Sequence, residues 1–148
     1  KLTGHKREIM KLEQSLPKDY IPSENEPFMN DAHVEYFRKK LLEWKNSILD
    51  ETATTIESMK DTTRNIPDIT DRASEETDRA LELRTRDRER KLITKIESAL
   101  RRIENGEYGY CEETGEPISL KRLDARPIAT FSLEAQERHE RREKIHKD

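Results

Sequence analysis

Apolar residues recur at alternating spacings of three and four through the first half of the chain. The stripe that they form consists of Val34, Phe37, Leu41, Trp44, Ile48, Thr55 and Met59. This spacing predicts a helix that packs against one partner helix along a single seam. Pro67 is expected to break the helix, because proline lacks an amide hydrogen and clashes with the preceding turn.

A second helical arm follows the break and is predicted to fold back along the first. Asp87 and Arg90 fall on its expected seam, so packing there must be loose, ionic or assisted by a partner. The two arms occupy residues 31–104 with a tip at 64–73, and each would extend about 45 Å at 1.5 Å per residue. The apolar seam positions of the second arm are expected to be Ala73, Ala80, Leu83, Ile96, Leu100 and Ile103.

The residues before and after the arms are predicted to form smaller parts. Residues 1–30 contain a short helical pattern and then a proline-containing connector, which should pack on a globular domain through Tyr20, Ile21, Phe28 and Met29. Asn30 or Asp31 is expected to cap the first arm. Residues 105–148 are predicted to form that small domain and a polar C-terminal helix.

The segment after the second arm is typical of a zinc-ribbon knuckle, with aromatics around a glycine and then a Gly-x-Pro-Ile turn. A structural zinc site needs four thiolate or imidazole ligands. The four expected ligand positions are here Cys111, Thr114, Ser132 and Ala135, and the histidines of the C-terminal helix have the wrong spacing. The sequence therefore predicts a zinc-ribbon shape without zinc.

Packing must then hold this domain together. The C-terminal helix from Leu133 is almost wholly polar and should lie on the surface. The expected core of the domain consists of Tyr108, Tyr110, Ile118, Leu120, Leu123, Ile128, Phe131 and Leu133, helped by Tyr20 and Phe28.

Composition narrows the class of protein. Charged residues make up 41% and apolar residues 31%, which suits a two-helix hairpin better than a compact globule. The net charge of −3 argues against a general nucleic-acid binder. No stretch is apolar enough for a membrane helix, and a single cysteine favours a reducing cytoplasm.

Two cations of the second arm differ from their neighbours. Several of its charges form favourable pairs with an oppositely charged residue four positions away: Glu82–Arg86, Asp87–Lys91, Glu75–Arg79 and Glu97–Arg101. Arg88 and Lys95 have no acid at the neighbouring positions of their own helix. Each is therefore open to an anion from outside the helix.

Four stretches together closely resemble the bacterial DksA family of the DksA/TraR group. They are Asp-Ile-Thr-Asp-Arg-Ala (68–73), Leu-Glu-Leu-Arg-Thr-Arg-Asp-Arg-Glu-Arg-Lys-Leu-Ile (81–93), Gly-Glu-Tyr-Gly-Tyr-Cys-Glu (106–112) and Lys-Arg-Leu-Asp-Ala-Arg-Pro (121–127). The resemblance covers roughly residues 28–145. It implies a mainly α fold: an antiparallel coiled-coil hairpin, a small zinc-ribbon-like domain and a C-terminal helix.

The resemblance also implies a function. The protein would bind RNA polymerase through its secondary channel and, with (p)ppGpp, modulate promoter open complexes of ribosomal RNA and amino-acid genes in the stringent response. It would be a cytoplasmic monomer that catalyses nothing and binds no promoter DNA itself. Which promoters respond, and in which direction, the sequence leaves open.

Residue roles follow from the same resemblance. Asp68, Asp71 and Ala73 match the functional tip, and Arg88 matches an arginine that holds the polymerase. The positions that line the nucleotide site are Leu92, Lys95 and Arg126. A further basic position of that site is here Gln136, which puts nucleotide affinity in question unless the nearby Arg138 compensates.

Two other classes of function are considered. A Gre-type factor would use the tip carboxylates to hold Mg²⁺ and stimulate transcript cleavage, since Mg²⁺ sites often use one or two carboxylates with borrowed ligands. Cleavage assays on backtracked complexes would separate this class from a regulator. A structural coiled-coil adaptor is disfavoured by the single fold-back and the acidic tip.

Overall fold

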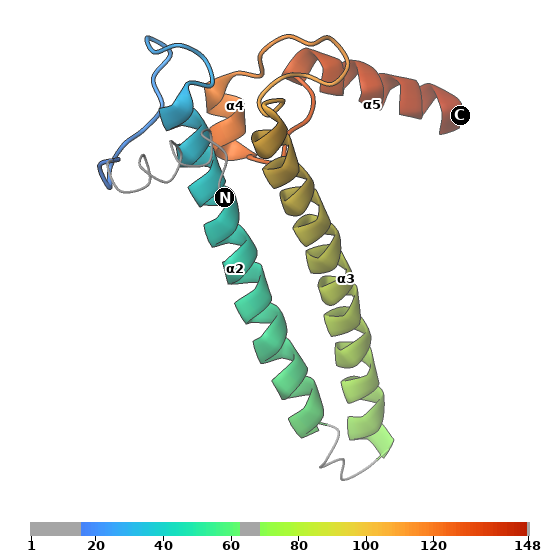
Figure 1. Ribbon diagram of the computed structural model, residues 1–148. Helices are drawn as coiled ribbons and strands as arrows, with labels where there is room; N and C mark the ends of the chain where they lie inside the picture. The colour runs from blue at the N-terminus through green and yellow to red at the C-terminus, as the bar shows by residue number, and fades with distance from the viewer. Residues whose placement is uncertain (1–15, 63–68, 148) are drawn as a thin grey trace. The chain divides into compact units, whose positions relative to one another are not determined.

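The computed structural model describes residues 16–62 and 69–147, and it groups them into two compact units. The hairpin unit is Leu42–Glu97, and the head unit combines the described residues up to Leu41 with those from Ser98 on. The described residues form four helices in order: α2 (Asp31–Thr62), α3 (Ile69–Asn105), α4 (Leu120–Ala125) and α5 (Leu133–Lys147). Figure 1 shows α2 and α3 running side by side in opposite directions, as the hairpin prediction requires.

The ends of the two long helices follow from local chemistry. The side chain of Asn30 accepts a hydrogen bond from the amide of His33 at 2.8 Å, which confirms the predicted cap of α2. Helix α3 begins at Ile69, so the last five residues of the predicted tip, 69–73, are helical instead. It ends before Gly106, whose φ of +74° is the left-handed conformation that glycine adopts most readily.

The seam of α2 agrees with the apolar pattern. Phe37 and Leu41 in the head unit and Ile48 in the hairpin unit are buried, while Val34 and Trp44 are half-buried. The side chains of Thr55 and Met59 lie outside the described residues.

The first half of the predicted apolar seam of α3 is wrong. Ala73 and Ala80 are exposed, and Leu83 is 45% exposed, while Ile96 and Ile103 are buried as expected. Asp87 and Arg90 also face solvent rather than the seam. Before Ile96, a series of half-buried positions repeats every three or four residues along α3 and consists of Glu75, Arg79, Glu82, Arg86, Glu89 and Ile93.

Polar contacts join the two arms of the hairpin unit. The hydroxyl of Thr52 donates to Glu89 Oε2 at 2.6 Å, and Lys45 Nζ lies 3.3 Å from Glu97 Oε1. In the described part of the chain, none of the four predicted i,i+4 ion pairs forms within 4 Å. Glu97 pairs across the hairpin, and Asp87 pairs with Arg90 at 3.9 Å, because these partners are nearer in the folded geometry.

The head unit has an apolar core around the start of α2 and the end of α3. Tyr110 and Leu133 were expected in this core but are 39% and 58% exposed. The ring of Phe28 nevertheless packs edge-on against Tyr110, with centroids 5.4 Å apart. The buried residues from the predicted set are Tyr108, Ile118, Leu120, Leu123 and Ile128.

Gly109 shows why the connector and the knuckle fit together. Its φ is +92°, and a Cβ there would lie 3.0 Å from the side chain of Met29. Phe28 and Met29 therefore contact the knuckle, whereas Ile21, which was also expected to be an anchor, is 71% exposed. The positive φ at Gly109 favours glycine at this position.

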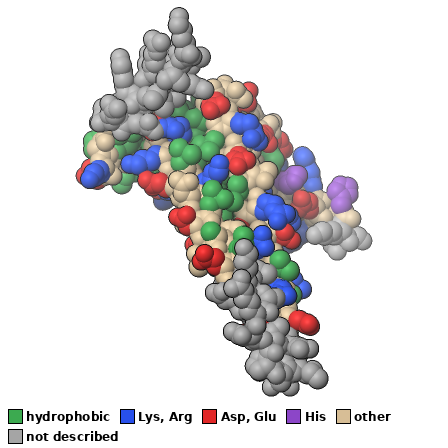
Figure 2. Space-filling model, turned by 60° about the horizontal axis from the view of Figure 1, so that its bottom comes forward, with side chains coloured by type: hydrophobic (Ala, Val, Ile, Leu, Met, Phe, Trp, Pro, Cys, Tyr) green, Lys and Arg blue, Asp and Glu red, His purple; other side chains and the backbone are tan. Residues whose placement is uncertain are grey.

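The outer surface carries charge of both signs. Figure 2 shows Lys and Arg interspersed with Asp and Glu over the described part of this face, with apolar patches between them. Helix α5 is exposed along most of its length, with Ala135 buried. None of the helices in the described ranges is long and apolar enough to span a membrane.

Candidate functional site

The predicted tip is only partly described. Asp68 lies outside the described residues, and so does the side chain of Asp71. Asp71 is the third residue of α3, so it lies inside the first turn and is not the residue that precedes the helix. Ala73 is exposed on the same helix.

The cations predicted to meet an outside anion lie on α3 in the hairpin unit. Arg88 and Lys95 are exposed, and Leu92 is half-buried. Among the described residues, neither Arg88 nor Lys95 has an ion pair or a side-chain hydrogen bond. The structure therefore leaves both side chains available, as their helical neighbours indicated.

The other residues of the predicted nucleotide site belong to the head unit. Arg126 is exposed and ends α4, where its amide donates to the carbonyl of Arg122. Gln136 is half-buried on α5 and donates to Glu140 at 3.1 Å. Arg138 lies 3.8 Å from Glu113, so the cation expected to compensate for Gln136 already has an acidic neighbour.

The knuckle has the predicted hairpin shape. Tyr110 and Pro117 form an antiparallel bridge, and the amide of Ile118 donates to the carbonyl of Gly109 at 2.7 Å. Within this turn, the amide of Cys111 donates to Glu116, and the amide of Gly115 donates to Cys111, both at 2.8 Å. Backbone hydrogen bonds therefore maintain the turn.

Hydrogen bonds surround the buried sulfur of Cys111. Burial alone raises the pKa of this thiol, but bonds from the Thr114 hydroxyl and from the amides of Ser132, Thr114 and Glu113 outweigh it and lower the pKa to about 7. These donors favour the thiolate without a metal ion.

The residues at the four expected ligand positions do not fit zinc. Ala135 is fully buried and has no donor atom, and the Ser132 hydroxyl accepts from the amide of Ala135 at the start of α5. In the described ranges, no three His, Cys, Asp or Glu side chains cluster as a metal site would require. One sulfur and two neutral hydroxyls are a poor donor set for Zn²⁺.

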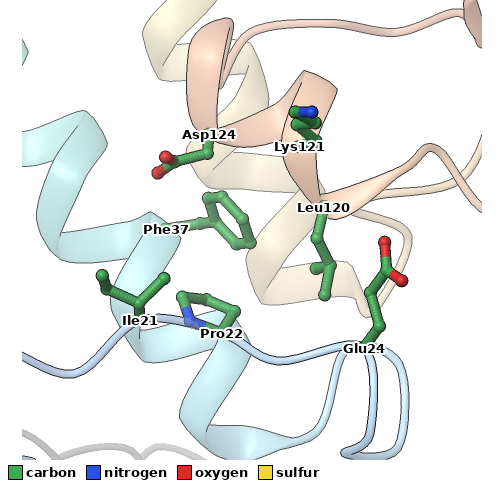
Figure 3. Close-up of a pocket in the computed structure, with 7 residues that line it drawn as sticks. All are labelled: Ile21, Pro22, Glu24, Phe37, Leu120, Lys121 and Asp124. Carbon is green, nitrogen blue, oxygen red and sulfur yellow. The ribbon is translucent and has the colours of Figure 1, made fainter.

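A pocket in the head unit was missed by sequence reasoning. It has a volume of about 290 Å³ and combines the connector, α2 and α4, as Figure 3 shows. Beside it, Asp124 Oδ1 accepts from the Tyr36 hydroxyl and from Lys40 Nζ, both at 2.6 Å. No local pattern signals such a site, because its residues come from three distant parts of the chain: Ile21, Pro22, Glu24, Phe37, Leu120, Lys121 and Asp124.

Comparison with known proteins decides the family. Residues 33–103 match the model of the N-terminal domain of the DnaK suppressor protein DksA, and residues 106–141 match the prokaryotic dksA/traR C4-type zinc finger. A Caulobacter vibrioides protein named RNA polymerase-binding transcription factor DksA is 67% identical over 130 residues, 88% of this chain and 92% of that protein. The chain belongs to the DksA family.

Other DksA proteins agree with this assignment. The Escherichia coli K12 protein of the same name is 44% identical over 84% of this chain and 83% of its own length. The solved structure of the transcription factor DksA2 from Pseudomonas aeruginosa has a TM-score of 0.75 and 39% identity, covering 93% of this chain and 98% of that one. The resemblance seen in the four sequence stretches and the mainly helical fold are thereby confirmed. The zinc-finger model matches residues 106–141, although three of this chain's four expected ligand positions have no cysteine.

Proposed function

We propose that this protein regulates transcription by binding RNA polymerase. The single observation that carries the proposal is 67% identity, over nearly the full length of both chains, to a protein named RNA polymerase-binding transcription factor DksA. The DksA family consists of transcription factors rather than enzymes, so the transcript-cleavage alternative is set aside. The partner resides in the bacterial cytoplasm, and the protein would act there as a monomer.

In the proposed mechanism, the hairpin enters the secondary channel and its tip acts near the polymerase active centre. Asp68, Asp71 and Ala73 would form the acting tip, and Arg88 would hold the polymerase. Two features support these roles: the exposed position of Arg88 and the absence of a described partner for its guanidinium.

The proposed effector is (p)ppGpp, bound at the interface with polymerase. Leu92, Lys95 and Arg126 would line its site, and exposed cations without partners suit phosphate groups. Gln136 removes one positive charge from that site, and Arg138 has Glu113 beside it. We therefore expect a nucleotide response weaker than that of a relative with a basic residue at this position.

Purified proteins test the function directly. The protein should bind core RNA polymerase and change transcription from a ribosomal RNA promoter, with a larger effect when (p)ppGpp is present. Absence of polymerase binding would refute the proposal. Cleavage of transcripts in backtracked complexes, measured in parallel, would restore the Gre-type alternative.

A further inference from the structure

The pocket of the head unit combines an apolar lining with charged groups. Its apolar lining consists of Ile21 and Pro22 from the connector, Phe37 from α2 and Leu120 from α4, as Figure 3 shows. Phe37 is fully buried and Leu120 is 9% exposed, so both belong to the core as well as to the pocket. The volume of about 290 Å³ lies at the lower end of the range for ligand pockets, about 300–1,000 Å³. The pocket therefore suits a small ligand.

Polar and aromatic contacts hold the walls of the pocket in place. The side chains of Tyr36 and Lys40, on α2, both donate to Asp124 of α4 at 2.6 Å. The ring of Tyr20 packs edge-on against that of Tyr36, with centroids 6.3 Å apart, and this contact joins the connector to α2. The pocket is therefore formed before a ligand binds, and little entropy is lost in ordering its walls.

Two opposite charges in the lining have no counter-ion within the described part of the chain. Asp124 is not one of them, because Lys40 lies 2.6 Å from its carboxylate. Glu24 and Lys121 are exposed, and neither side chain has an ion pair or a hydrogen bond among the described residues. Exposed charges are commonly solvated, but these two line a pocket whose interior is apolar, one from the connector and one from α4 (Figure 3).

This combination selects among classes of ligand. A phosphate compound needs several cations or amides, whereas the lining offers Lys121 beside the carboxylates of Glu24 and Asp124. A sugar needs hydrogen-bonding groups across its faces, but the interior of this pocket is formed by apolar side chains. A molecule that carries an apolar side chain next to an ammonium and a carboxylate group matches the apolar lining and both free charges.

We infer that the pocket binds a free α-amino acid with a large apolar side chain, of the size of leucine or phenylalanine. The side chain of the ligand packs against Phe37 and Leu120, its ammonium group faces Glu24, and its carboxylate faces Lys121. Burial of the side chain supplies most of the affinity, and the two charged groups orient the ligand. None of the residues assigned to the (p)ppGpp site lines this pocket, so this ligand goes beyond the proposed function.

Titration of the full chain with amino acids tests the binding. Amide chemical shifts in NMR spectra are followed as L-leucine is added. The shifts should concentrate around Ile21 and Lys121 and saturate with a Kd on the order of 1 mM, because the ligand is small and the charges are exposed. L-Alanine has the same two charges but lacks the large side chain, so it should bind at least about tenfold more weakly.

Two variants with matched ligands assign the two charges. Glu24→Gln should raise the Kd for L-leucine about threefold but should not raise that for isocaproate, which lacks the ammonium group. Lys121→Gln should have a similar effect on L-leucine but should not raise the Kd for isoamylamine, which lacks the carboxylate. The matched control is Glu137→Gln with Lys144→Gln, which neutralises two exposed residues of α5 outside the pocket and should bind L-leucine as the wild type does.

A third variant tests the apolar lining. Ile21 is 71% exposed, so Ile21→Ser should fold normally and yet raise the Kd for L-leucine about threefold. Melting temperatures of all variants are measured to confirm folding. Absence of saturable shifts with L-leucine and L-phenylalanine up to about 10 mM would overturn the inference. Equal affinities for L-leucine and L-alanine, or equal weakening in the control and the pocket variants, would overturn it as well.

The other candidate occupant is the N-terminal segment of the chain itself. Residues 1–15 lie outside the described residues and include Ile9 and Leu12. If Ile9→Ser with Leu12→Ser binds L-leucine and the wild type does not, this segment occupies the pocket and the amino-acid site is refuted. None of these assays contains polymerase, so their outcome leaves the proposed function to its own test.

Discussion

His33 is fully buried, yet neither ring nitrogen has a hydrogen-bond partner among the described residues. Its nearest acid is Glu26, whose Oε2 lies 3.7 Å from Nε2 and is already bonded to Tyr20 and Asn30. Burial lowers the pKa of His33, and this outweighs the opposing effects of the Glu26 charge and of the Ser23 carbonyl. The imidazole is therefore neutral in the folded head unit near neutral pH.

This lowered pKa predicts acid sensitivity. The unfolded state binds more protons than the folded state once pH falls below about 6.5, so the contribution of His33 to stability is lost as pH falls. The His33→Leu variant should lack this loss, and its free energy of unfolding relative to wild type should rise by at most about 1.4 kcal/mol per pH unit below that point. Urea unfolding between pH 5 and 8 measures the difference.

Glu35 also titrates in this pH range, but its effect on stability is opposite to that of His33. Comparing His33→Leu with the wild type cancels the effect of Glu35. Burial raises the pKa of Glu35 to about 7, although Arg38 bonds both carboxylate oxygens at 3.0 Å. In the folded protein this carboxyl keeps a proton that it releases in the unfolded chain. The contribution of Glu35 to the free energy of unfolding therefore increases as pH falls from about 7 towards 4.5. Wild type and His33→Leu share this term. A difference that stays constant with pH would show that His33 does not titrate.

Arg88 and Lys95 are expected to serve different functions at little cost in stability. Neither has a described partner, so truncation to alanine removes no intramolecular pair. Arg88→Ala should weaken polymerase binding, and Lys95→Ala should reduce only the (p)ppGpp-dependent response, by about 1.5–3 kcal/mol for a charge-assisted phosphate contact. Transcription and binding assays with and without (p)ppGpp measure the two effects. A melting temperature lowered by many degrees in Lys95→Ala would make that lysine structural.

At the scale of the element, α3 changes character along its length. Its end near the head carries the buried Ile96 and Ile103, but from Glu75 to Glu89 the face towards α2 is charged. Oε2 of Glu75 and Nε of Arg86 are buried without a hydrogen-bond partner in the described residues. The part of the hairpin unit nearer the tip is therefore held more weakly than the part nearer the head.

Replacing Arg86 by an apolar residue should stabilise the hairpin. Methionine keeps the length of the side chain and removes the buried unpaired nitrogen, so Arg86→Met is expected to raise the free energy of unfolding by about 1 kcal/mol. Arg84→Met, an exposed position on the same helix, is the control and should stay within about 0.5 kcal/mol of wild type. Hydrogen exchange of the α3 amides measures both. Loss of stability in Arg86→Met would mean that the guanidinium meets an acid in solution.

The same charged face explains where sequence reasoning succeeded and failed. The α2 seam was predictable because large apolar residues, Phe37, Leu41 and Ile48, fix its phase. In α3 the small apolar residues Ala73 and Ala80 were predicted to lie on the packed face. They lie on a different face of the helix from the buried Ile96 and Ile103 at its other end. Burying the large side chains of Ile96 and Ile103 stabilises the fold more than burying two alanines would, so the isoleucines decide which face of α3 packs. Charged side chains on that same face then lie in the seam. The pocket beside Asp124 had no local signal at all.

The hydrogen bonding of the knuckle predicts that this domain folds without a metal ion. Backbone hydrogen bonds hold the turn, and amides and a hydroxyl surround the Cys111 sulfur. Elemental analysis of the purified protein should find no stoichiometric zinc, and chelators should leave its melting temperature unchanged, unlike a zinc-dependent domain. The triple variant Thr114→Cys, Ser132→Cys, Ala135→Cys restores four thiols and is the positive control, expected to bind zinc. Near-stoichiometric zinc in the wild type would contradict the prediction.

At the scale of the whole molecule, the proposed function assigns polymerase binding to the middle of α3 and the effect on transcription to residues at and just before its start. The exposed cations lie between Arg84 and Lys95, whereas the acidic tip residues Asp68 and Asp71 lie about 15 residues before them. Asp71 is in the first turn of α3, where the negative charge of a carboxylate interacts favourably with the helix dipole. These acids therefore have two possible roles, stabilising the start of the helix and acting on the polymerase.

Asparagine distinguishes the two roles, because it caps a helix about as well as aspartate but has no charge. The double variant Asp68→Asn, Asp71→Asn forgoes only about 0.3–1 kcal/mol of dipole interaction at most. It should keep helix content and polymerase binding nearly unchanged and abolish the effect on transcription from a ribosomal RNA promoter. The matched control is Glu76→Gln with Asp78→Asn, which removes two exposed acids of α3 beyond its first turn and should retain full activity. If the tip variant regulates as well as this control does, the tip acids serve the helix alone, and the regulatory chemistry must lie elsewhere on the hairpin.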